Sequence, residues 1–513
     1  MSKQVTTNES SFLGSVDYKV LIPTCALLAL ALFFAVTDTE AFGKAFNGIR
    51  SWIIKDLSWS YKLIYVFYYV VAIWLACSRY GDLKLGLPED KPEFSFGSWI
   101  AMLFSCAIGL GFIFWGVAEP MYHFMNTPHT AASGTAAAAP VAIAITVFHW
   151  GAHQWVAYVA VGLAIAYPAF RYGKPMMIST ALYGLLGDRF KNSWWAKVLE
   201  IMGAFAAIGG VATMLGLGIL SLTYGFKSLF GIEMGMTGQI LFLLFIVAAY
   251  VLSASSGLNK GIKILSNTNM YTAFIWVIFI IVAGPTTFIF DHITESFGLY
   301  LKNIVWWSFW NDAAGTANGW QDWWTKFYFI WTISFAPFVG GFLARISRGR
   351  TIREFVLGAI VPPTLAIAFF FGLMGSSSIY VELNQIAPLW ESIQANYGAG
   401  IFVLLETYPM GYFLSLLVVF NLIIFLVTSA DSTSFFVAMQ MSGGDLNPKI
   451  TMRLFWGALI GILAIVLLVS GGMKALQSCA VVAGAPFGFA LVAMVVSLIK
   501  NLKDDVNNKG ITK

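Results

Sequence analysis

Long apolar stretches limit the folds open to this sequence more than any other feature. About twelve of them contain the roughly 20 apolar residues that an α-helix needs to cross a hydrocarbon core about 30 Å thick. Since 58% of the residues are hydrophobic and only 11% are charged, a soluble fold is excluded. We predict an all-α membrane protein whose spans begin near Tyr18, Tyr61, Ser98, Ala139, Lys197, Thr237, Met270, Trp323, Glu354, Gly411, Met452 and Leu476.

Basic residues are distributed unevenly among the connecting loops. With the N-terminus in the cytoplasm, the even-numbered loops and both tails contain about 22 of the 30 Lys and Arg residues, as the positive-inside rule requires. We therefore expect a multi-pass protein of the plasma (inner) membrane with both termini cytoplasmic. The formal net charge of +5 reflects this topology and does not indicate a nucleic-acid partner.

Two spans at matching positions contain residues that disturb helices. The third span ends in "FWGVAEP", and the eighth contains "APFVGG". Interrupted spans at matching positions of two blocks are typical of inverted-repeat transporters, whose binding site lies between them near the membrane midplane. We expect such a site here, with a break in the eighth span between Pro337 and Gly341. The alternative is that the glycines only allow close helix packing.

This pattern predicts five parts of the chain. Residues 1–95 contain the N-terminal tail and two peripheral spans. Residues 96–291 form the first inverted repeat, spans three to seven, and residues 323–500 form the second, spans eight to twelve. The Trp-rich segment 292–322 between them is predicted to lie along the outer interface as an amphipathic element. Residues 501–513 form a short cytoplasmic tail.

An aromatic stripe follows one face of the eighth span. Its rings recur at intervals of three or four residues: Trp324, Tyr328, Trp331, Phe335, Phe338 and Phe342. Such a face can pack or contact lipid, but ring quadrupoles also attract cations, by about 2 kcal/mol per ring once water is excluded. A quaternary ammonium has no N–H donor, so rings are its natural ligands. Tyr122, Trp150 and Trp155 are candidates to complete the site.

Several motifs together resemble the betaine/choline/carnitine transporters. They are "FWGVAEP", "FHWGAHQW", "GWQDWWTKFYFIW", "APFVGG", "FLARISRGRTIRE" and "LVTSADSTS". The resemblance implies a LeuT-like fold, in which two extra helices precede a five-plus-five inverted repeat, and assembly as a homotrimer. It also implies a secondary active transporter that imports a small quaternary ammonium or related zwitterion by alternating access. Glycine betaine is the leading substrate, and carnitine, choline and dimethylsulfoniopropionate remain open.

Carried over position by position, the resemblance also implies a substrate site. This sequence departs from the family pattern at two positions, which leaves fewer aromatic and donor groups in the implied aromatic box. Thr332 follows Trp331 where the family commonly has consecutive tryptophans, and Phe335 stands where Trp or Tyr is common. The implied substrate-binding residues are Tyr122, Trp150, Trp155, Tyr158, Trp331, Thr332 and Phe335.

The same resemblance implies Na⁺ as the coupling ion and no other cofactor. Hydroxyls alone in a membrane helix often bond to their own backbone, but adjacent hydroxyls and free carbonyls can also hold Na⁺. The sodium-independent carnitine branch has an Arg where this chain has the neutral Asn269, so symport is expected and substrate/product antiport is the alternative. The implied ligands are the hydroxyls of Thr428 and Ser429 and the carbonyls of Ser105, Ile108 and Phe425.

The arginines after the eighth span have two explanations. Anchoring at the cytoplasmic lipid surface accounts for part of the run "ARISRGRTIRE". The resemblance adds gating contacts to neighbouring helices and protomers, which we assign to Arg345 and Arg348.

Catalytic chemistry has little support in the sequence. Glu119, Glu406, Asp431, His149 and His153 show no recognisable spacing of nucleophile, base or metal ligands. An enzyme is therefore not expected. A membrane enzyme and a channel are the alternatives from other functional classes.

Overall fold

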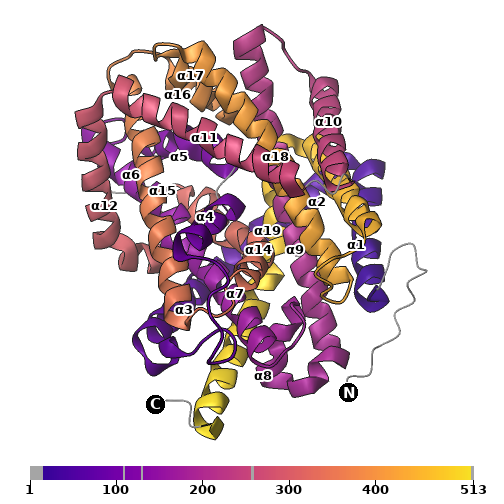
Figure 1. Cartoon of the computed structure of the whole chain (residues 1–513). Coiled ribbons are helices and arrows are strands. Elements are labelled where there is room, and N and C mark those ends of the chain that lie inside the picture. The colour runs from indigo at the N-terminus through magenta and orange to yellow at the C-terminus, as the bar shows by residue number, and fades with distance from the viewer. Residues whose placement is uncertain (1–15, 108–109, 129–130, 256–258, 510–513) are drawn as a thin grey trace.

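Helices run through all parts of the chain that the computed structural model describes, which are residues 16–107, 110–128, 131–255 and 259–509 (Figure 1). The main helices are α1 (Tyr18–Thr37), α3 (Ser58–Cys77), α4 (Phe96–Ala107), α5 (Leu110–Met125), α6 (Ala139–Trp150), α7 (Ala152–Arg171), α9 (Trp194–Phe230), α10 (Met236–Ser255), α11 (Asn259–Ala283), α12 (Thr286–Phe309), α14 (Thr325–Arg345), α15 (Ile352–Leu383), α18 (Gly411–Met441) and α19 (Ile450–Lys509). The remaining α-helices are α2 (Thr39–Trp52), α8 (Tyr183–Leu186), α13 (Trp320–Trp323), α16 (Leu389–Ala395) and α17 (Gly400–Glu406). The described part of every expected span is helical, which confirms the all-α membrane fold.

Eight helices within the described ranges are long and apolar enough to cross a membrane, or nine when the pair bent by 107° at residues 284–285 is counted as one span. The expected number was about twelve, on the basis of roughly 20 residues per span. The difference arises because the third span is divided between α4 and α5, because the apolar part of α10 is short, and because α19 contains two expected spans. The chain therefore crosses the membrane many times.

The helices differ greatly in how much of their apolar surface the rest of the chain covers. The apolar window of α14 is 94% buried, whereas that of α1 is 28% buried. The windows of the segments Ala136–Arg171 and Trp194–Phe230 are each 83% buried. Therefore α6, α7, α9 and α14 form the core, and α1 lies at the periphery with most of its apolar side chains free to face lipid.

The expected break in the eighth span is wrong, because α14 continues through Pro337 to Arg345. Its glycines serve close packing instead. A Cβ atom at Gly340 would lie 2.5 Å from Cβ of Val161, and one at Gly341 would lie 2.8 Å from Cε2 of Phe436. Both positions therefore allow neighbouring helices to approach α14, which is the alternative explanation given by membrane helix packing.

Helix breaks occur at other glycines. Gly151 separates α6 from α7 with ψ −133°, which no α-helix allows. Gly472 interrupts α19 with φ +56° and ψ −134°, a conformation that is essentially restricted to glycine. The fourth span is thus interrupted beside Trp150, and the two expected C-terminal spans meet at the Gly471–Gly472 kink.

Several of the segments predicted to be cytoplasmic lie together at one end of the molecule. The backbone N–H of Leu85 donates to the carbonyl of Arg350, at 2.8 Å, which joins the loop before α4 to the loop before α15. At the same end Arg171 pairs with Asp505 near the end of α19 at 3.1 Å. The ends of α7, α14 and α19 therefore share one face, as the distribution of basic residues requires.

The predicted interfacial segment corresponds largely to α12. This helix is bent by 107° from the end of α11 and packs against α6 and α15. Leu301, Val305 and Trp306 are exposed along it. The interfacial position of α12 and the division of the chain into two inverted repeats stay predictions.

Candidate functional site

A pocket lined mainly by aromatic and apolar side chains lies among α6, α7, α9, α14 and α18. Half of its lining comes from α14, and four of those six residues belong to the aromatic stripe. The lining residues are Trp150, Gln154, Tyr158, Val211, Met214, Tyr328, Trp331, Thr332, Phe335, Phe338, Val339 and Ser429. We call this set the aromatic pocket. The helical period of the stripe therefore puts a continuous ring surface along one wall.

The rings of the aromatic pocket meet edge to face. The centroids of Trp150 and Trp331 are 5.9 Å apart with an interplanar angle of 85°. Trp331 and Phe335 are 5.7 Å apart at 71°, and Tyr328 and Trp331 are 5.5 Å apart at 68°. These separations lie in the range in which aromatic pairs stabilise one another. Ring faces turned in different directions also form the kind of surface that surrounds a methylated cation.

Five of the seven predicted substrate-binding residues line the aromatic pocket. Trp150 and Tyr158 reach it from α6 and α7 across the break at Gly151. Trp331, Thr332 and Phe335 come from α14.

Trp155 and Tyr122 lie outside this lining. Trp155 is buried behind it, with its ring 5.8 Å from that of Tyr158. Tyr122, near the end of α5, packs against Trp324 at 5.0 Å, Trp390 at 5.3 Å and Tyr397 at 5.8 Å. These rings form a separate aromatic cluster, which the sequence could not distinguish from the pocket because both clusters draw rings from the same stripe.

Polar atoms are few in the aromatic pocket. Gln154 Nε2 donates a hydrogen bond to the hydroxyl of Tyr158 at 2.8 Å, and Thr332 and Ser429 add hydroxyls to the lining. The indole nitrogen of Trp331 is buried and has no hydrogen-bond partner among the residues that the structure describes. A pocket with several rings and a small number of polar groups suits a small organic cation that also has a hydrogen-bonding group.

The sequence from residue 19 to residue 507 matches the family model described as "BCCT, betaine/carnitine/choline family transporter". The chain belongs to this family. It is therefore a membrane transporter and not an enzyme, and the resemblance inferred from its motifs is confirmed.

Characterised relatives cover nearly the whole transporter. The chain is 38% identical to the glycine betaine transporter OpuD of Bacillus subtilis over 94% of its length and 93% of that protein. It is 37% identical to the ectoine/hydroxyectoine transporter of Virgibacillus pantothenticus over 95% of its length and 97% of that protein. It is 34% identical to the osmo-dependent choline transporter BetT2 of Acinetobacter baylyi, over 92% of this chain and 70% of that protein.

The predicted sodium ligands are brought together only in part. The Thr428 hydroxyl donates to the carbonyls of Ile424, at 2.9 Å, and Phe425, at 3.3 Å, as a hydroxyl within a membrane helix commonly does. Ser429 lines the aromatic pocket. Of the other two predicted ligands, Ile108 lies outside the described residues, and so does the side chain of Ser105 near the end of α4. The sodium site of the transporter stays a prediction.

Asn269 lies in a buried polar network between α11 and α18. Nδ2 of Asn421 donates to the carbonyl oxygen of Asn269 at 2.9 Å and to its Oδ1 at 2.5 Å. The indole N–H of Trp276 donates to Oδ1 of Asn421 at 3.0 Å. Asn269 is thus a neutral, buried and hydrogen-bonded residue.

The arginines at the end of α14 and in the loop after it differ in their contacts. Arg345 is exposed, and Arg348 is an exposed partner of Asp90, with Nε 3.4 Å from Oδ2. The backbone N–H of Leu87 and then the Arg348 guanidinium lower the pKa of Asp90. Arg348 therefore contacts the segment before α4, whereas the gating roles of Arg345 and Arg348 stay predictions.

Arg350, which the sequence did not single out, is buried beside that segment. It donates from Nη2 to the carbonyl of Phe94 at 2.8 Å, and its Cζ lies 4.3 Å from the ring centroid of Trp99. Burial lowers the pKa of its guanidinium, and the charge of Glu354 opposes this shift. Arg350 thus holds the loop after α14 against the residues before α4.

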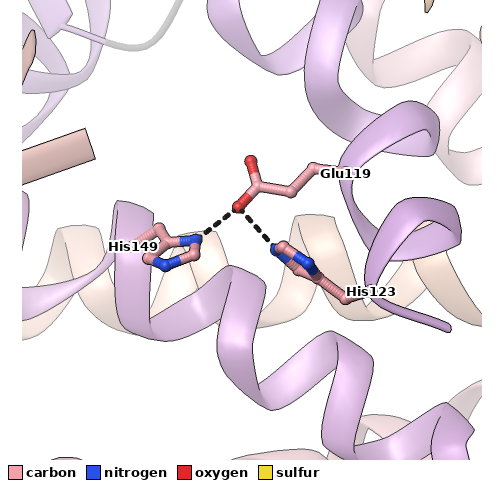
Figure 2. Close-up of side chains that lie close together, drawn as sticks. All are labelled: Glu119, His123 and His149. Atoms are coloured by element: carbon pink, nitrogen blue, oxygen red, sulfur yellow. Dashed lines mark hydrogen bonds and ion pairs between the residues drawn. The ribbon is translucent and has the colours of Figure 1, made fainter. Parts of the chain in front are cut away.

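The sequence also gave no indication of the role of Glu119, a buried carboxylate close to the aromatic pocket. Figure 2 shows Oε1 of Glu119 between Nδ1 of His149, at 2.7 Å, and Nε2 of His123, at 3.3 Å. Sequence spacing gave no sign of this group because His149 comes from another helix. An acidic residue inside the apolar run "FWGVAEP" was the available signal, since ionisable residues within membrane spans are commonly functional.

Glu119, His123 and His149 could in principle hold a metal, since their ligand atoms lie within 4.8 Å of one another. Their geometry is that of hydrogen bonds. Two ligands bound tetrahedrally at about 2.0–2.2 Å from one metal lie roughly 3.3 Å apart, whereas Oε1 of Glu119 and Nδ1 of His149 are 2.7 Å apart. We therefore interpret the group as a hydrogen-bonded cluster.

Proposed function

We propose that this transporter imports a small quaternary ammonium compound or related zwitterion, with glycine betaine as the leading substrate, by Na⁺-coupled symport with alternating access. The aromatic pocket is the observation that carries the proposal. The ring of Trp331 on α14 lies within 6 Å of two others, that of Phe335 on the same helix and that of Trp150 on α6. Water is largely excluded among buried rings, so each ring face attracts a trimethylammonium group more strongly than it would in water.

The substrate preference is supported by relatives as well as by chemistry. OpuD, a glycine betaine transporter, is 38% identical to this chain over almost its entire length. The ectoine/hydroxyectoine transporter is nearly as similar, at 37% identity, so a cyclic zwitterion is a second candidate. Carnitine, choline and dimethylsulfoniopropionate also contain a methylated cation, so they should be tested as competitors of glycine betaine uptake.

Sodium coupling is supported by the position of Ser429. This residue lies in the lining of the aromatic pocket, one position after Thr428. An ion bound at these hydroxyls would therefore lie close enough to the substrate for the two to bind cooperatively. The neutral Asn269 supports symport over the sodium-independent exchange of substrate for product, because it provides no fixed positive charge to replace the ion.

The cellular arrangement belongs to the same proposal. We place the end that contains the loops before α4 and α15 in the cytoplasm, with both termini there, and we expect a homotrimer in the plasma (inner) membrane. The gathering of basic segments at that end supports this orientation.

Uptake into sealed proteoliposomes tests the proposal. We expect saturable uptake of radiolabelled glycine betaine that is driven by an inward Na⁺ gradient and is abolished when K⁺ replaces external Na⁺. If uptake does not depend on Na⁺ but is faster when the vesicles contain carnitine or betaine, the transporter is an exchanger and the symport proposal is wrong. Transport of none of the methylated or cyclic zwitterions would overturn the proposed substrate class.

A further inference from the structure

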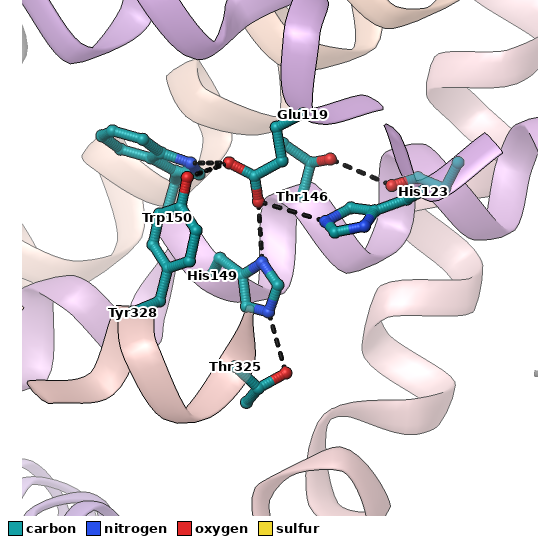
Figure 3. A network of polar contacts seen from close by, with 8 residues as sticks. Glu119, His123, Thr146, His149, Trp150, Thr325 and Tyr328 are labelled. Carbon is teal, nitrogen blue, oxygen red and sulfur yellow. Dashed lines mark hydrogen bonds and ion pairs between the residues drawn. The ribbon is translucent and has the colours of Figure 1, made fainter. Parts of the chain in front are cut away.

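Four side chains on three helices form hydrogen bonds with the carboxylate of Glu119. Its side chain on α5 is fully buried. Oε2 accepts from the indole N–H of Trp150, at 2.7 Å, and from the hydroxyl of Tyr328. Oε1 lies at hydrogen-bond distance from Nδ1 of His149, at 2.7 Å, and from Nε2 of His123, at 3.3 Å. Figure 3 shows these side chains converging on the carboxylate from α5, α6 and α14.

These contacts suit an ionised carboxylate between neutral histidines. An ionised carboxylate can only accept, so Nδ1 of His149 and Nε2 of His123 are then the donors; Nε2 of His149 lies 2.9 Å from the hydroxyl of Thr325, which can donate to it. Tryptophan can only donate, so Oε2 is an acceptor in that contact. With two donors on each oxygen, the carboxylate is satisfied without a bonded cation. Hydrogen bonds to an ionised acceptor are also stronger than those between neutral groups.

The buried Lys62 forms its hydrogen bonds with groups other than Glu119. The Lys62 ammonium on α3 binds the backbone oxygens of Trp307 and Trp310, the first at 3.5 Å, and lies 3.2 Å from Oε1 of Gln321. Within the described residues, the ion-pair contacts of Glu119 involve only His123 and His149. Its negative charge is therefore compensated by hydrogen bonds rather than by a fixed positive charge.

Two of the four side chains that bond to Glu119 also line the aromatic pocket. Trp150 and Tyr328 line it with their rings and bond to the same oxygen of Glu119 through their polar atoms. We propose that Glu119 is the fixed counter-charge of the aromatic pocket, a positioning residue that holds Trp150 and Tyr328 and makes the pocket selective for ligands with a positively charged group. This inference rests on the proposed function and names the property of the ligand that the site selects.

The physical reason is electrostatic. A charge separated from the pocket by single side chains acts through a medium of low dielectric constant, where Coulomb attraction is much stronger than in water. The hydrogen bond from the indole N–H to an anion also increases the negative potential at the ring face that meets a cation. A ligand with the same shape but no positive charge should gain neither effect.

Glycine betaine and its carbon isostere, 3,3-dimethylbutanoate, separate charge from shape. The isostere has a tert-butyl group where glycine betaine has trimethylammonium. We would measure the affinity of the purified full-length transporter for both compounds, by competition against radiolabelled glycine betaine, in the wild type and in Glu119→Gln. Loss of the negative charge behind the pocket should weaken glycine betaine binding by roughly tenfold or more. The relative affinity for 3,3-dimethylbutanoate should rise, because an anion no longer faces the carboxylate.

Three further variants complete the test. Glu119→Asp keeps the charge and should keep the preference for glycine betaine over the isostere. Trp150→Phe keeps a ring but removes the N–H bonded to Oε2, so it should reduce the preference in the same direction with the carboxylate in place. Glu200→Gln is the matched control, since Glu200 is a buried carboxylate of α9 that accepts from Ser179 outside the pocket. It should leave the preference unchanged.

The outcomes are distinct. A wild type that binds neither glycine betaine nor any other methylated zwitterion overturns the proposed function and this inference with it. A wild type that prefers glycine betaine, with Glu119→Gln weakening both compounds by the same factor, overturns the inference alone and leaves Glu119 a purely structural role. If Glu119→Gln does not fold, an unchanged preference in Trp150→Phe has the same meaning.

Discussion

The rings of Trp150 and Trp331 stand almost perpendicular, at 85°, with their centroids 5.9 Å apart. One ring comes from the end of α6 and the other from the middle of α14. The edge of one ring thus meets the face of the other, which leaves two indole surfaces turned toward the aromatic pocket. The first prediction follows from this pair.

Replacing Trp331 by Ala should weaken glycine betaine binding by roughly 1–3 kcal/mol, because both cation–π attraction and buried ring surface are lost. Trp331→Phe should cost less, since it keeps a ring. Isothermal titration or intrinsic fluorescence would measure the affinities. Trp194→Ala is a suitable control because that ring is exposed at the start of α9. Near-normal affinity of folded Trp331→Ala protein would remove this residue from the site.

The degree of methylation should determine affinity. Glycine, sarcosine, dimethylglycine and glycine betaine differ only in N-methyl groups, and rings favour the diffuse cation that lacks N–H donors. We expect the inhibition constants against glycine betaine uptake to fall along this series. The series should flatten in Trp331→Ala, where one ring is absent. Equal competition by all four compounds in the wild type would mean that the stripe serves packing only.

Ser429→Ala should raise the Na⁺ concentration needed for half-maximal uptake far more than it changes substrate affinity at saturating Na⁺. An ion that favours the substrate-ready state is coupled to the substrate by a shared free energy, typically about 1–3 kcal/mol, and a higher ion concentration offsets a weaker ion site.

Ser434→Ala is the control on the same helix, because its hydroxyl bonds to the carbonyl of Asp431 at 2.8 Å and does not line the pocket. An unchanged Na⁺ dependence in Ser429→Ala would remove this hydroxyl from the ion site. Such a result would leave the aromatic pocket itself unaffected.

Arg350→Ala should destabilise the transporter by about 1–3 kcal/mol, whereas Arg345→Ala should have little effect. Arg350 is buried against Trp99 and the carbonyl of Phe94, and its loss leaves that acceptor without its donor. Arg345 is exposed. Thermal unfolding in detergent would compare the two variants. Equal midpoints would mean that the loop after α14 is held by its backbone hydrogen bonds alone.

The positions of the helices could be predicted because the physics is local in sequence. A chain in a bilayer must satisfy its backbone hydrogen bonds within each span, so a sufficiently long apolar run becomes a helix whatever its neighbours are. The aromatic stripe of α14 was predictable for the same reason, since the helical period alone puts residues at three- and four-residue spacing on one face. Its four central rings do line the pocket.

The tertiary structure decided which side chains meet. Tyr122 and Trp150 were equal candidates in the sequence, but α5 turns Tyr122 toward Trp324 and Tyr397, away from the pocket. Pro337 was expected to break its helix, yet α14 continues because close neighbours such as Val161 support it through Gly340. Helix composition predicts a tendency to break, whereas packing determines where a break occurs.

The Glu119 cluster shows the same limit most clearly. Glu119, His149 and Tyr328 lie on three helices, and no spacing in the sequence relates them. The sequence by itself determined a helical membrane transporter with an aromatic face, because span length and helical period act over a few turns. Only the tertiary structure decided that a buried carboxylate stands behind that face, because contacts between helices depend on how each one is rotated and packed against the others.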